Sequence, residues 1–276
     1  MGRVLIVAGS DSGGGAGIQA DVKAVTMLGG YAATAITALT AQNTLGVLGI
    51  EPVPPDFVAL QMEAVLVDIG ADAIKIGMLG SAENVARVAA TCRRLAPSVP
   101  IVLDPVMVAK GGSRLLEPSA ERALAGELIP MAALLTPNVP EAEALSGERI
   151  TDEAKLLYVA SRLLLLGPGA VLLKGGHLEG DRVVDYLVTA DGTVDRFESP
   201  RLRSRSTHGT GCTLASAIAA GIAEGLTLAD SVGRARRYVL EAIRTAPGLG
   251  AGHGPLNHGH PLAPLPPAHK ANARAN

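Results

Sequence analysis

The feature of this sequence that most constrains its fold is the alternation of short apolar runs with longer segments of helical period. The run RVLIVAG near the N-terminus precedes a segment in which Ile18, Val22 and Val25 fall on one helical face. Further apolar runs are ADAIKIGM, IVLDPV, ALLTPN and AVLLKGG. Because these runs are continuous rather than alternating, they predict strands buried on both faces. The sequence therefore predicts an α/β fold of three layers, α/β/α, with a mainly parallel central sheet.

The remaining segments extend this pattern over most of the chain. The runs RVVDYLVTA and TVDRFES flank the dipeptide Asp191-Gly192, which favours an antiparallel hairpin. After about His258 the sequence carries too little apolar content to pack. We expect one domain over residues 1–258 and a disordered tail over residues 259–276. Further helices are expected from Asp56 to Asp68, from Ser81, from about Pro118 to Ile129, after a Thr151 cap, and from about Thr210 and Leu228.

The charge balance and the absence of long apolar stretches narrow the choice of partners. The formal net charge is -2, without the basic excess that nucleic acid or anionic membranes favour. No uncharged stretch reaches the ~18 residues needed to span a bilayer, and the N-terminus has no cleavable signal pattern. We therefore expect a cytoplasmic protein that binds small molecules, with neither nucleic acid nor membrane as a partner.

Polar or glycine-rich segments follow several of the predicted strands. They cover residues 9–17, 41–44, 77–81, 104–112, 136–143 and 174–177. Ligands of a parallel sheet bind outside the carboxyl ends of its strands, so we expect these segments to gather around one site. The first segment lacks the G-x-G-x-x-G spacing of dinucleotide-binding proteins, and no G-x-x-x-x-G-K-[ST] motif occurs anywhere, which argues against a P-loop.

The stretch HGTGCTLASAIAAGIAEGL places a glycine turn at the start of a predicted helix. Backbone N–H groups of Gly209, Thr210 and Gly211, together with the helix N-terminus, predict an anion site. Cys212 lies inside this turn, where the helix N-terminus is expected to lower the pKa of its thiol; the alternative is a small thiol that packs the helix start. Cys92, in contrast, falls in helical step with apolar residues and is expected in the core.

At this point the motifs carry a resemblance. GSDSGGGAGIQAD, AQNT, IKIGMLG, LDPVM, TPNVPEAE, LLKGGH, STHGTGCTLASAIAA and GPLNH, in order over residues 9–258, resemble the hydroxymethylpyrimidine and hydroxymethylpyrimidine-phosphate kinases of thiamine biosynthesis. These kinases belong to the ribokinase-like superfamily. The resemblance implies a ribokinase-like fold, a homodimer, and MgATP as phosphoryl donor, with Mg²⁺ as cofactor. It implies phosphorylation of 4-amino-5-hydroxymethyl-2-methylpyrimidine and then of its monophosphate.

Two other functions remain as alternatives to this activity. A pyridoxal or pyridoxine kinase is the near neighbour within the class, and the AQNT motif disfavours it. A nucleotide-sensing protein without catalysis is the alternative outside the class, and such a protein would not need the complete turn with Cys212.

On the nucleotide side, the resemblance assigns roles to several polar residues. Asn138 and Glu141 match the N-x-x-E motif that organises Mg²⁺, and Asp104 supplies a second carboxylate. Lys174 and Thr207 are expected to contact nucleotide phosphates. The alternatives are a carboxylate in the first helical turn for Glu141, a turn former for Asp104 and a solvated strand end for Lys174. His208 receives no role.

On the acceptor side, the resemblance assigns Gln42 to the aminopyrimidine, whose edge its amide complements. Asp21 is expected to receive the amino or hydroxyl group of the substrate. Gly9, Met78 and Val106 are expected to form a flat apolar slot, although Met78 fits the core equally well. The resemblance also implies that the turn at Gly209, Thr210 and Gly211 stabilises the transferred phosphoryl group and that Cys212 acts as the general base.

Overall fold

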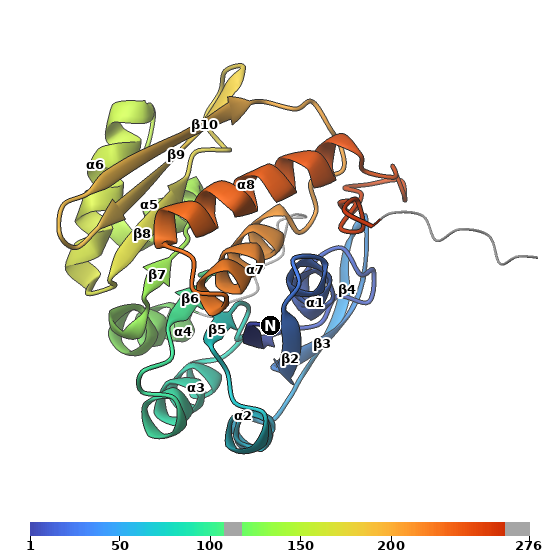
Figure 1. The fold of residues 1–276 in the computed structure, drawn as a ribbon, viewed down its shortest axis with the longest axis vertical. Helices are drawn as coiled ribbons and strands as arrows, with labels where there is room; N and C mark the ends of the chain where they lie inside the picture. Colours follow the sequence, from blue (N-terminus) through green and yellow to red (C-terminus); the bar gives the residue numbers. More distant parts are fainter. Residues whose placement is uncertain (108–117, 263–276) are drawn as a thin grey trace, which may run out of the picture.

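The computed structural model describes residues 1–107 and 118–262. Its main feature is an eight-stranded sheet with the order β10-β9-β8-β7-β6-β5-β1-β2 (Figure 1). The strands are β1 (Arg3–Ala8), β2 (Tyr31–Ile36), β5 (Ala73–Ile76), β6 (Ile101–Leu103), β7 (Leu134–Leu135), β8 (Ala170–Lys174), β9 (Arg182–Thr189) and β10 (Val194–Pro200).

Six of these strands, from β2 to β8 across the sheet, run parallel, and only β9 and β10 add antiparallel pairs. The predicted hairpin at Asp191-Gly192 is therefore confirmed. Its turn is held by Asp191 Oδ1, which accepts a hydrogen bond from the N–H of Thr193 at 3.0 Å. The predicted mainly parallel sheet is confirmed as well.

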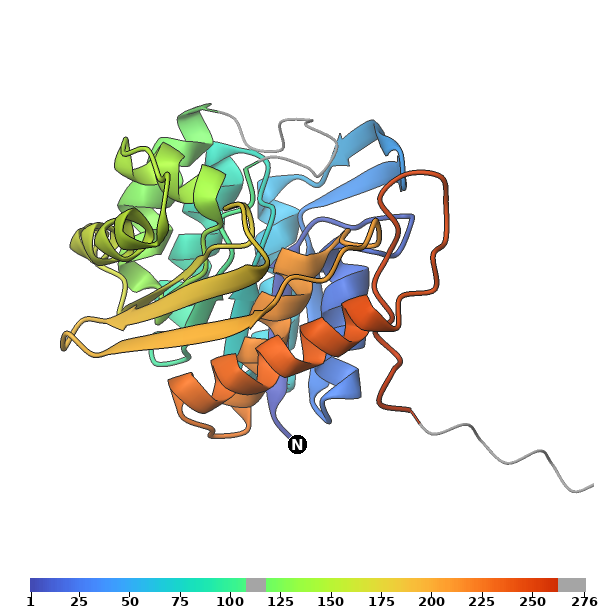
Figure 2. The same ribbon diagram turned by 90° about the horizontal axis from the view of Figure 1, so that it is seen from above.

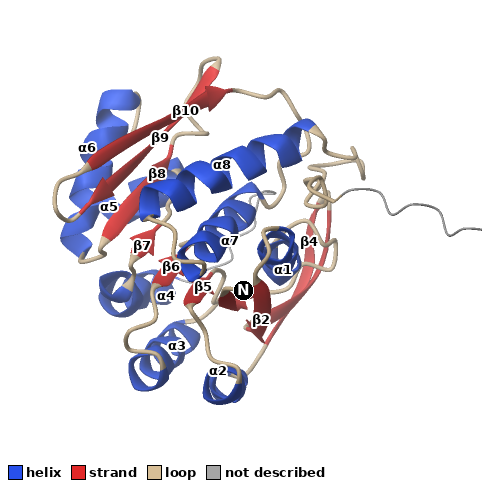
Figure 3. Cartoon of the chain, in the orientation of Figure 1, coloured by secondary structure: helices blue, strands red, loops and turns tan. Residues whose placement is uncertain are grey.

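Helices cover both faces of the sheet, which confirms the three layers (Figure 3). Along β1, Leu5 and Val7 belong to one apolar cluster while Val4 and Ile6 belong to the other, so this strand is buried on both sides. The first cluster includes residues of α2 (Pro55–Asp68), α3 (Ala82–Leu95), α4 (Pro118–Ala123), α5 (Val139–Ser146) and α6 (Glu153–Leu163). The second includes residues of α1 (Gly17–Met27), α7 (Thr210–Ala223) and α8 (Leu228–Arg244).

Two helix starts were predicted from a capping side chain, and one of the two is confirmed. Ser81 caps α3, since its hydroxyl accepts from the N–H of Asn84 at 3.2 Å. The predicted Thr151 cap is wrong: Asp152 caps α6 and accepts from the N–H of Lys155 at 2.9 Å. A carboxylate is the stronger acceptor at a helix N-terminus, and the Thr151 hydroxyl instead donates to Asp152.

The sequence pattern predicted that the AQNT motif forms a loop at the edge of the central sheet, and this prediction is wrong. The motif begins in β3 (Ala38–Asn43), which pairs with β4 (Gly46–Pro52) in a separate two-stranded sheet. Gln42 therefore lies on a strand, directly after a register shift between Ala41 and Gln42. Such irregularities re-aim a side chain, and the Gln42 amide reaches to 3.2 Å from His208 Nε2, near the start of α7.

The C-terminal segment packs further than the predicted boundary at residue 258. His260 Nε2 lies 3.1 Å from the carbonyl oxygen of Tyr238, and the two rings are 4.8 Å apart. The segment also passes beside β3 and β4, where the N–H of His253 donates to the Thr44 carbonyl at 2.8 Å (Figure 2). The rest of the predicted tail, residues 263–276, and residues 108–112 of one predicted loop lie outside the described residues.

Within the ranges 1–107 and 118–262, no helix combines the length and the apolarity that a membrane crossing requires. Cys92 is fully buried on α3, as predicted, and burial raises the pKa of its thiol to about 12.

Candidate active site

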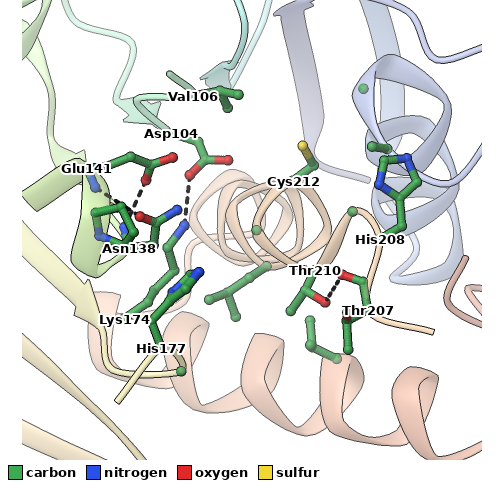
Figure 4. A pocket seen from close by; sticks show the side chains of 18 of the residues that line it. Asp104, Val106, Asn138, Glu141, Lys174, His177, Thr207, His208, Thr210 and Cys212 are labelled. Carbon is green, nitrogen blue, oxygen red and sulfur yellow. Dashed lines mark hydrogen bonds and ion pairs between the residues drawn. The ribbon is translucent and has the colours of Figure 1, made fainter. Parts of the chain in front are cut away.

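A cavity of about 1010 Å³ opens at the carboxyl ends of the parallel strands. Its walls bring together segments that are far apart in the sequence, as predicted. They include Gly9 after β1, Met78 after β5, Asp104 after β6, Lys174 at the end of β8 and Cys212 in the first turn of α7. Figure 4 shows the polar side chains of this cavity arranged around the N-terminus of α7.

The glycine turn before α7 leaves backbone N–H groups open toward the cavity. Gly209 caps the helix with a φ of 80°, and a Cβ there would lie 1.8 Å from the carbonyl oxygen of Gly15. A glycine is therefore required both by the backbone and by the first loop packed against it. The N–H of Thr210 donates weakly to the Thr207 carbonyl at 3.4 Å, and the N–H of Thr213 donates to the Gly209 carbonyl at 2.9 Å. Among the described residues, the N–H groups of Gly211 and Cys212 have no acceptor.

A cation and a carboxylate face this turn. Lys174 Nζ forms an ion pair with Asp104 Oδ1 at 2.9 Å, and both side chains are largely buried. A Cβ on Gly211 would lie 3.3 Å from Lys174 Nζ, so the ammonium group stands directly beside the open N–H groups. Lys174 is thus not a solvated strand end. Burial alone would lower its pKa, but the charges of Asp104 and Glu141 outweigh burial and raise it.

Asn138 and Glu141 form a capping box at the start of α5. Asn138 Oδ1 accepts from the N–H of Glu141 at 3.0 Å, and Glu141 Oε2 accepts from the N–H of Asn138 at 2.8 Å. The structural alternative for Glu141 therefore holds, and yet both side chains also line the cavity. Burial, and to a smaller extent the nearby Asp104 charge, raises the pKa of Glu141 to about 7 against the opposing effect of Lys174.

The carboxylates of Asp104 and Glu141 fit a magnesium ion. The described residues contain no group of three or more His, Cys, Asp or Glu that could hold a metal by itself. Mg²⁺ does not need one, since it keeps several waters and takes one or two carboxylates together with phosphate oxygens. The Asp104 charge raises the pKa of Glu141, so a cation between the two groups would relieve their repulsion.

Cys212 is the third residue of α7 and lines the cavity. Burial raises the pKa of its thiol to about 12, although the positive charge of Lys75 acts in the opposite direction. The prediction that the helix N-terminus lowers this pKa is therefore wrong. The cost of desolvating a thiolate exceeds what the partial charge of one helix end supplies.

Asp21 does not reach the cavity, and the predicted contact of its carboxylate with substrate is wrong. It is fully buried on α1, where its two oxygens accept from Lys75 Nζ at 2.8 Å and from Ser216 Oγ at 2.7 Å. Lys75 itself lines the cavity near Cys212. The sequence does carry a signal for Lys75, which is a single lysine inside the apolar run AIKIGM. A lysine in a buried strand requires a buried partner of opposite charge.

The other acceptor-side residues do line the cavity: Gly9, Gln42, Met78 and Val106. Thr207 lines it as well, beside the glycine turn, where its carbonyl accepts from the Thr210 hydroxyl at 2.8 Å. A Cβ on Gly9 would lie 2.2 Å from Met78 Cε, so the glycine makes room for the methionine. Met78 is 9% exposed, which makes it both a core residue and a wall of the cavity.

Two residues without a predicted role, Asp11 and His208, organise the first loop. Asp11 accepts from the N–H groups of Gly13, Gly15 and Ala16 at 2.8, 3.1 and 2.8 Å. His208 Nε2 lies 2.8 Å from Asp11 Oδ2. Although burial alone would raise it, the hydrogen bonds from His208 and the backbone hold the pKa of Asp11 below its ordinary value.

Comparison with known proteins places this geometry among kinases. The chain is 55% identical over 258 residues to the thiamine biosynthesis bifunctional protein ThiED of Geobacter sulfurreducens, covering 93% of this chain and 52% of that protein. It thus spans about half the length of that relative. It is 51% identical over 257 residues to the hydroxymethylpyrimidine/phosphomethylpyrimidine kinase of Mycobacterium bovis, covering 92% of this chain and 93% of that protein.

Two solved structures share the fold. The phosphomethylpyrimidine kinase of Clostridium difficile matches with a TM-score of 0.78 and 40% identity, over 88% of this chain and all of that chain. The pyridoxal kinase of Staphylococcus aureus in complex with AMP-PCP and pyridoxal matches with a TM-score of 0.85 and 32% identity, over 94% of each chain.

Fold and site together define this chain as a small-molecule kinase with the ribokinase-like fold. Its sheet order, glycine turn and cavity lie within the part of the chain that matches the two kinase structures, which is most of its length. The family model described as phosphomethylpyrimidine kinase matches residues 11–257. The chain belongs to the phosphomethylpyrimidine kinase family.

Proposed function

We propose that this kinase transfers the γ-phosphoryl group of ATP to the hydroxymethyl group of 4-amino-5-hydroxymethyl-2-methylpyrimidine, and then phosphorylates the resulting monophosphate again, in thiamine diphosphate biosynthesis. The observation that carries the proposal is that one cavity holds both the acceptor-side residues and the anion turn, with Cys212 among them. The relatives at 51% and 55% identity, one named as a kinase of this substrate and the other named for thiamine biosynthesis, support it.

The transferred phosphoryl group would be held by the glycine turn. The open N–H groups of Gly211 and Cys212 and the positive end of α7 stabilise charge on its oxygens. Lys174 adds a cation beside the same turn. Asp104 and Glu141 would hold Mg²⁺, which supplies charge neutralisation to the nucleotide phosphates, while Asn138 fixes Glu141 through the capping box. Thr207, beside the turn, would contact a nucleotide phosphate.

The acceptor hydroxyl would lose its proton to Cys212. Its oxygen forms the new bond to phosphorus while the bond between the γ-phosphorus and the bridging oxygen breaks and ADP leaves. Burial raises the pKa of the Cys212 thiol to about 12 even with the opposing charge of Lys75 beside it, so the general-base role is the step of the proposal that most needs a direct test. The alternative, in which the thiol only packs the start of α7, is separated from this one by substitution of Cys212.

The acceptor ring would lie in the slot formed by Gly9, Met78 and Val106, with its polar edge on the Gln42 amide. A pyridoxal kinase is the weaker alternative, since the pyridoxal kinase of known structure is 32% identical and the pyrimidine kinase of known structure is 40% identical to this chain.

The proposal extends to assembly and location. We expect a single kinase domain over residues 1–258, continued by the packed residues 259–262, and a homodimer in the cytoplasm, where ATP is available. Exposed apolar side chains on the two-stranded sheet support an interface there: Leu39 is 51%, Leu48 79% and Ile50 45% exposed. Light scattering of the purified protein measures the oligomeric state directly.

A coupled assay of ADP release over a panel of acceptors tests the activity. We expect turnover with the aminopyrimidine alcohol and with its monophosphate, and little turnover with pyridoxal. Turnover with pyridoxal alone would replace the proposal by the pyridoxal kinase. Binding of ATP without turnover of any acceptor would instead favour a nucleotide-sensing protein.

A further inference from the structure

His208 lines the cavity, but the proposed reaction gives it no part. Its side chain is 12% exposed, and its Nε2 lies 2.8 Å from the carboxylate of Asp11, which is 2% exposed. It directly precedes Gly209, and a Cβ on Gly15 would lie 2.7 Å from its ring, so the imidazole is wedged between two glycine loops. A histidine held this firmly has a single ring orientation.

The neighbour of this ring on the cavity side is the amide of Gln42. The atom placed as Gln42 Nε2 lies 3.2 Å from His208 Nε2, and the atom placed as Gln42 Oε1 lies 3.3 Å from Thr40 Oγ1. The Thr40 hydroxyl is also 2.8 Å from the Ser10 carbonyl oxygen. The amide is therefore enclosed between the His208 ring nitrogen and the Thr40 hydroxyl oxygen. The second partner of the ring nitrogen is the Asp11 carboxylate and that of the hydroxyl is the Ser10 carbonyl, and these partners decide where the two protons lie.

The protons of this chain of groups can be assigned from their partners. The hydrogen bonds that lower the pKa of Asp11 keep its carboxylate ionised, so Asp11 only accepts and the proton must sit on His208 Nε2. A carbonyl oxygen also only accepts, so the Thr40 proton goes to Ser10 and Thr40 Oγ1 is free to accept. His208 Nε2 carries one proton, which Asp11 accepts at 2.8 Å, so Nε2 has no lone pair for an amide N–H at 3.2 Å, whereas Thr40 Oγ1 can accept one. The amide therefore fits with its two ends exchanged, the oxygen beside His208 and the nitrogen beside Thr40. The two ends of an amide are alike in shape, so these neighbours fix which end is oxygen and which is nitrogen.

We propose that His208, held by Asp11, is a positioning residue that fixes the Gln42 amide in one orientation, with its oxygen toward the ring and its nitrogen toward Thr40, and thereby makes the site select acceptor rings by the order of their donors and acceptors. The inference rests on the proposed function, in which Gln42 meets the ring edge of the acceptor.

The chemistry of the acceptor gives this orientation a consequence. A 4-aminopyrimidine presents an amino donor beside a ring nitrogen that accepts. Its 4-oxo counterpart presents a carbonyl acceptor beside a ring N–H that donates, so the order is reversed. A fixed amide matches one of these edges and leaves unpaired polar groups against the other. An amide that can turn by 180° matches both.

The experiment measures kcat/KM for two acceptors at saturating ATP: the 4-amino alcohol and 5-hydroxymethyl-2-methylpyrimidin-4-one. The parent protein should prefer the amino compound. In His208→Phe, which keeps a ring of similar shape without the Nε2 proton, the preference should fall by roughly tenfold or more through an increase for the oxo compound. His208→Gln, which can still donate from its side chain, should retain much of the preference. The KM for ATP should change less than about twofold in both variants.

A second variant acts from the other side of the amide and keeps the test decisive if His208→Phe does not fold. Thr40→Val removes the acceptor that holds the amide nitrogen, and it should also lower the preference for the amino compound. Calorimetric binding of the two acceptors to each variant gives a readout besides turnover.

An unchanged preference in His208→Phe, or in Thr40→Val where the former does not fold, overturns the inference. An equal loss for both acceptors together with weaker ATP binding also overturns it, since His208 would then only hold the loops together. Failure of the proposed function has a different signature, because the parent protein would then phosphorylate neither pyrimidine.

Discussion

At the scale of single residues, the strongest test concerns the Cys212 thiol. Cys212→Ala should leave the binding of acceptor and nucleotide nearly unchanged and lower kcat by roughly 10² to 10⁴, the usual contribution of a general base. Steady-state kinetics and calorimetry measure the two quantities separately. Cys92→Ala is the matched control, because that thiol is buried on α3 away from the cavity. Turnover of Cys212→Ala within a few-fold of the parent would reduce Cys212 to a packing role.

The second residue prediction concerns the carboxylate of Glu141. Glu141→Gln keeps an oxygen for the capping box but removes the charge proposed to act through Mg²⁺. We expect a lower kcat and a higher Mg²⁺ concentration for half-maximal rate. Lys174→Met should lower turnover with a nearly unchanged Mg²⁺ requirement. A Mg²⁺ titration of Glu141→Gln that superimposes on that of the parent would exclude the metal role.

The third residue prediction concerns the buried pair of Lys75 and Asp21. Both side chains are 0% exposed, so Lys75→Met leaves an uncompensated carboxylate in the core. We expect the free energy of unfolding to fall by roughly 3–5 kcal/mol, and the double variant Lys75→Met/Asp21→Asn to recover part of the loss. Urea denaturation measures both. Lys155→Met, which breaks a half-exposed pair with Glu148, should cost less than about 1 kcal/mol.

The contrast between these residues shows what the sequence could predict. Lys174 ends a strand and Cys212 lies in the first turn of a helix, and these two ends meet at the same edge of the parallel sheet. A local sequence pattern was therefore sufficient to place both residues in the cavity. Asp21 was misplaced because helical period gives the face of a helix but not what packs on that face. Its partner Lys75 lies 54 positions away in the sequence, and only the fold brings the two together.

At the scale of elements, the glycine turn before α7 makes the clearest prediction. Gly209→Ala combines a φ of 80° with a Cβ placed 1.8 Å from the Gly15 carbonyl. We expect it to displace the turn, to weaken nucleotide binding and to lower the thermal midpoint. Gly225→Ala is the matched control, since Gly225 has a φ of 86° and nothing within 4 Å of its Cβ position.

The control variant should lose only about 1 kcal/mol, the ordinary cost of a left-handed residue, and should bind nucleotide normally. Equal effects of the two substitutions on binding would mean that the close packing of the turn on the first loop does not matter for the site.

The elements themselves were easier to predict than their relations. Continuous apolar runs gave the parallel strands, and the Asp191-Gly192 turn gave the hairpin, because both are local signals. The AQNT segment was wrongly assigned to a loop of the central sheet. Its strand β3 pairs with β4 outside that sheet, and short alternating runs do not say which sheet a strand joins.

At the scale of the whole molecule, the C-terminal segment ties separate parts together through His258. Its Nε2 lies 2.9 Å from the Thr213 hydroxyl on α7, and its carbonyl accepts from the Tyr238 hydroxyl on α8 at 2.7 Å. Burial lowers the pKa of His258 to about 4, against an ordinary value of 6.5. The folded protein therefore holds this ring neutral where the unfolded chain would protonate it.

The sign of the resulting pH dependence follows from linkage. As the pH falls below about 6.5 the unfolded chain gains a proton that the folded protein refuses until about pH 4, so stability falls over this interval. Between about pH 7.5 and about pH 5 we expect a loss of about 2 kcal/mol from this group. In His258→Gln this part of the loss should vanish. Urea denaturation of both proteins at the two pH values measures it, and identical pH dependence in the two would show that His258 titrates normally.

The separation of β3 and β4 from the central sheet has a consequence for how substrate specificity can change during evolution. The Gln42 amide, which is proposed to meet the acceptor ring, lies on the separate two-stranded sheet, whereas the glycine turn and the carboxylates proposed to handle the phosphates lie on the eight-stranded sheet and its helices. Substitutions in the two-stranded sheet can alter which alcohol is accepted while the phosphoryl donor and its machinery are inherited intact. Such a division would separate part of the choice of acceptor from the handling of the phosphoryl donor.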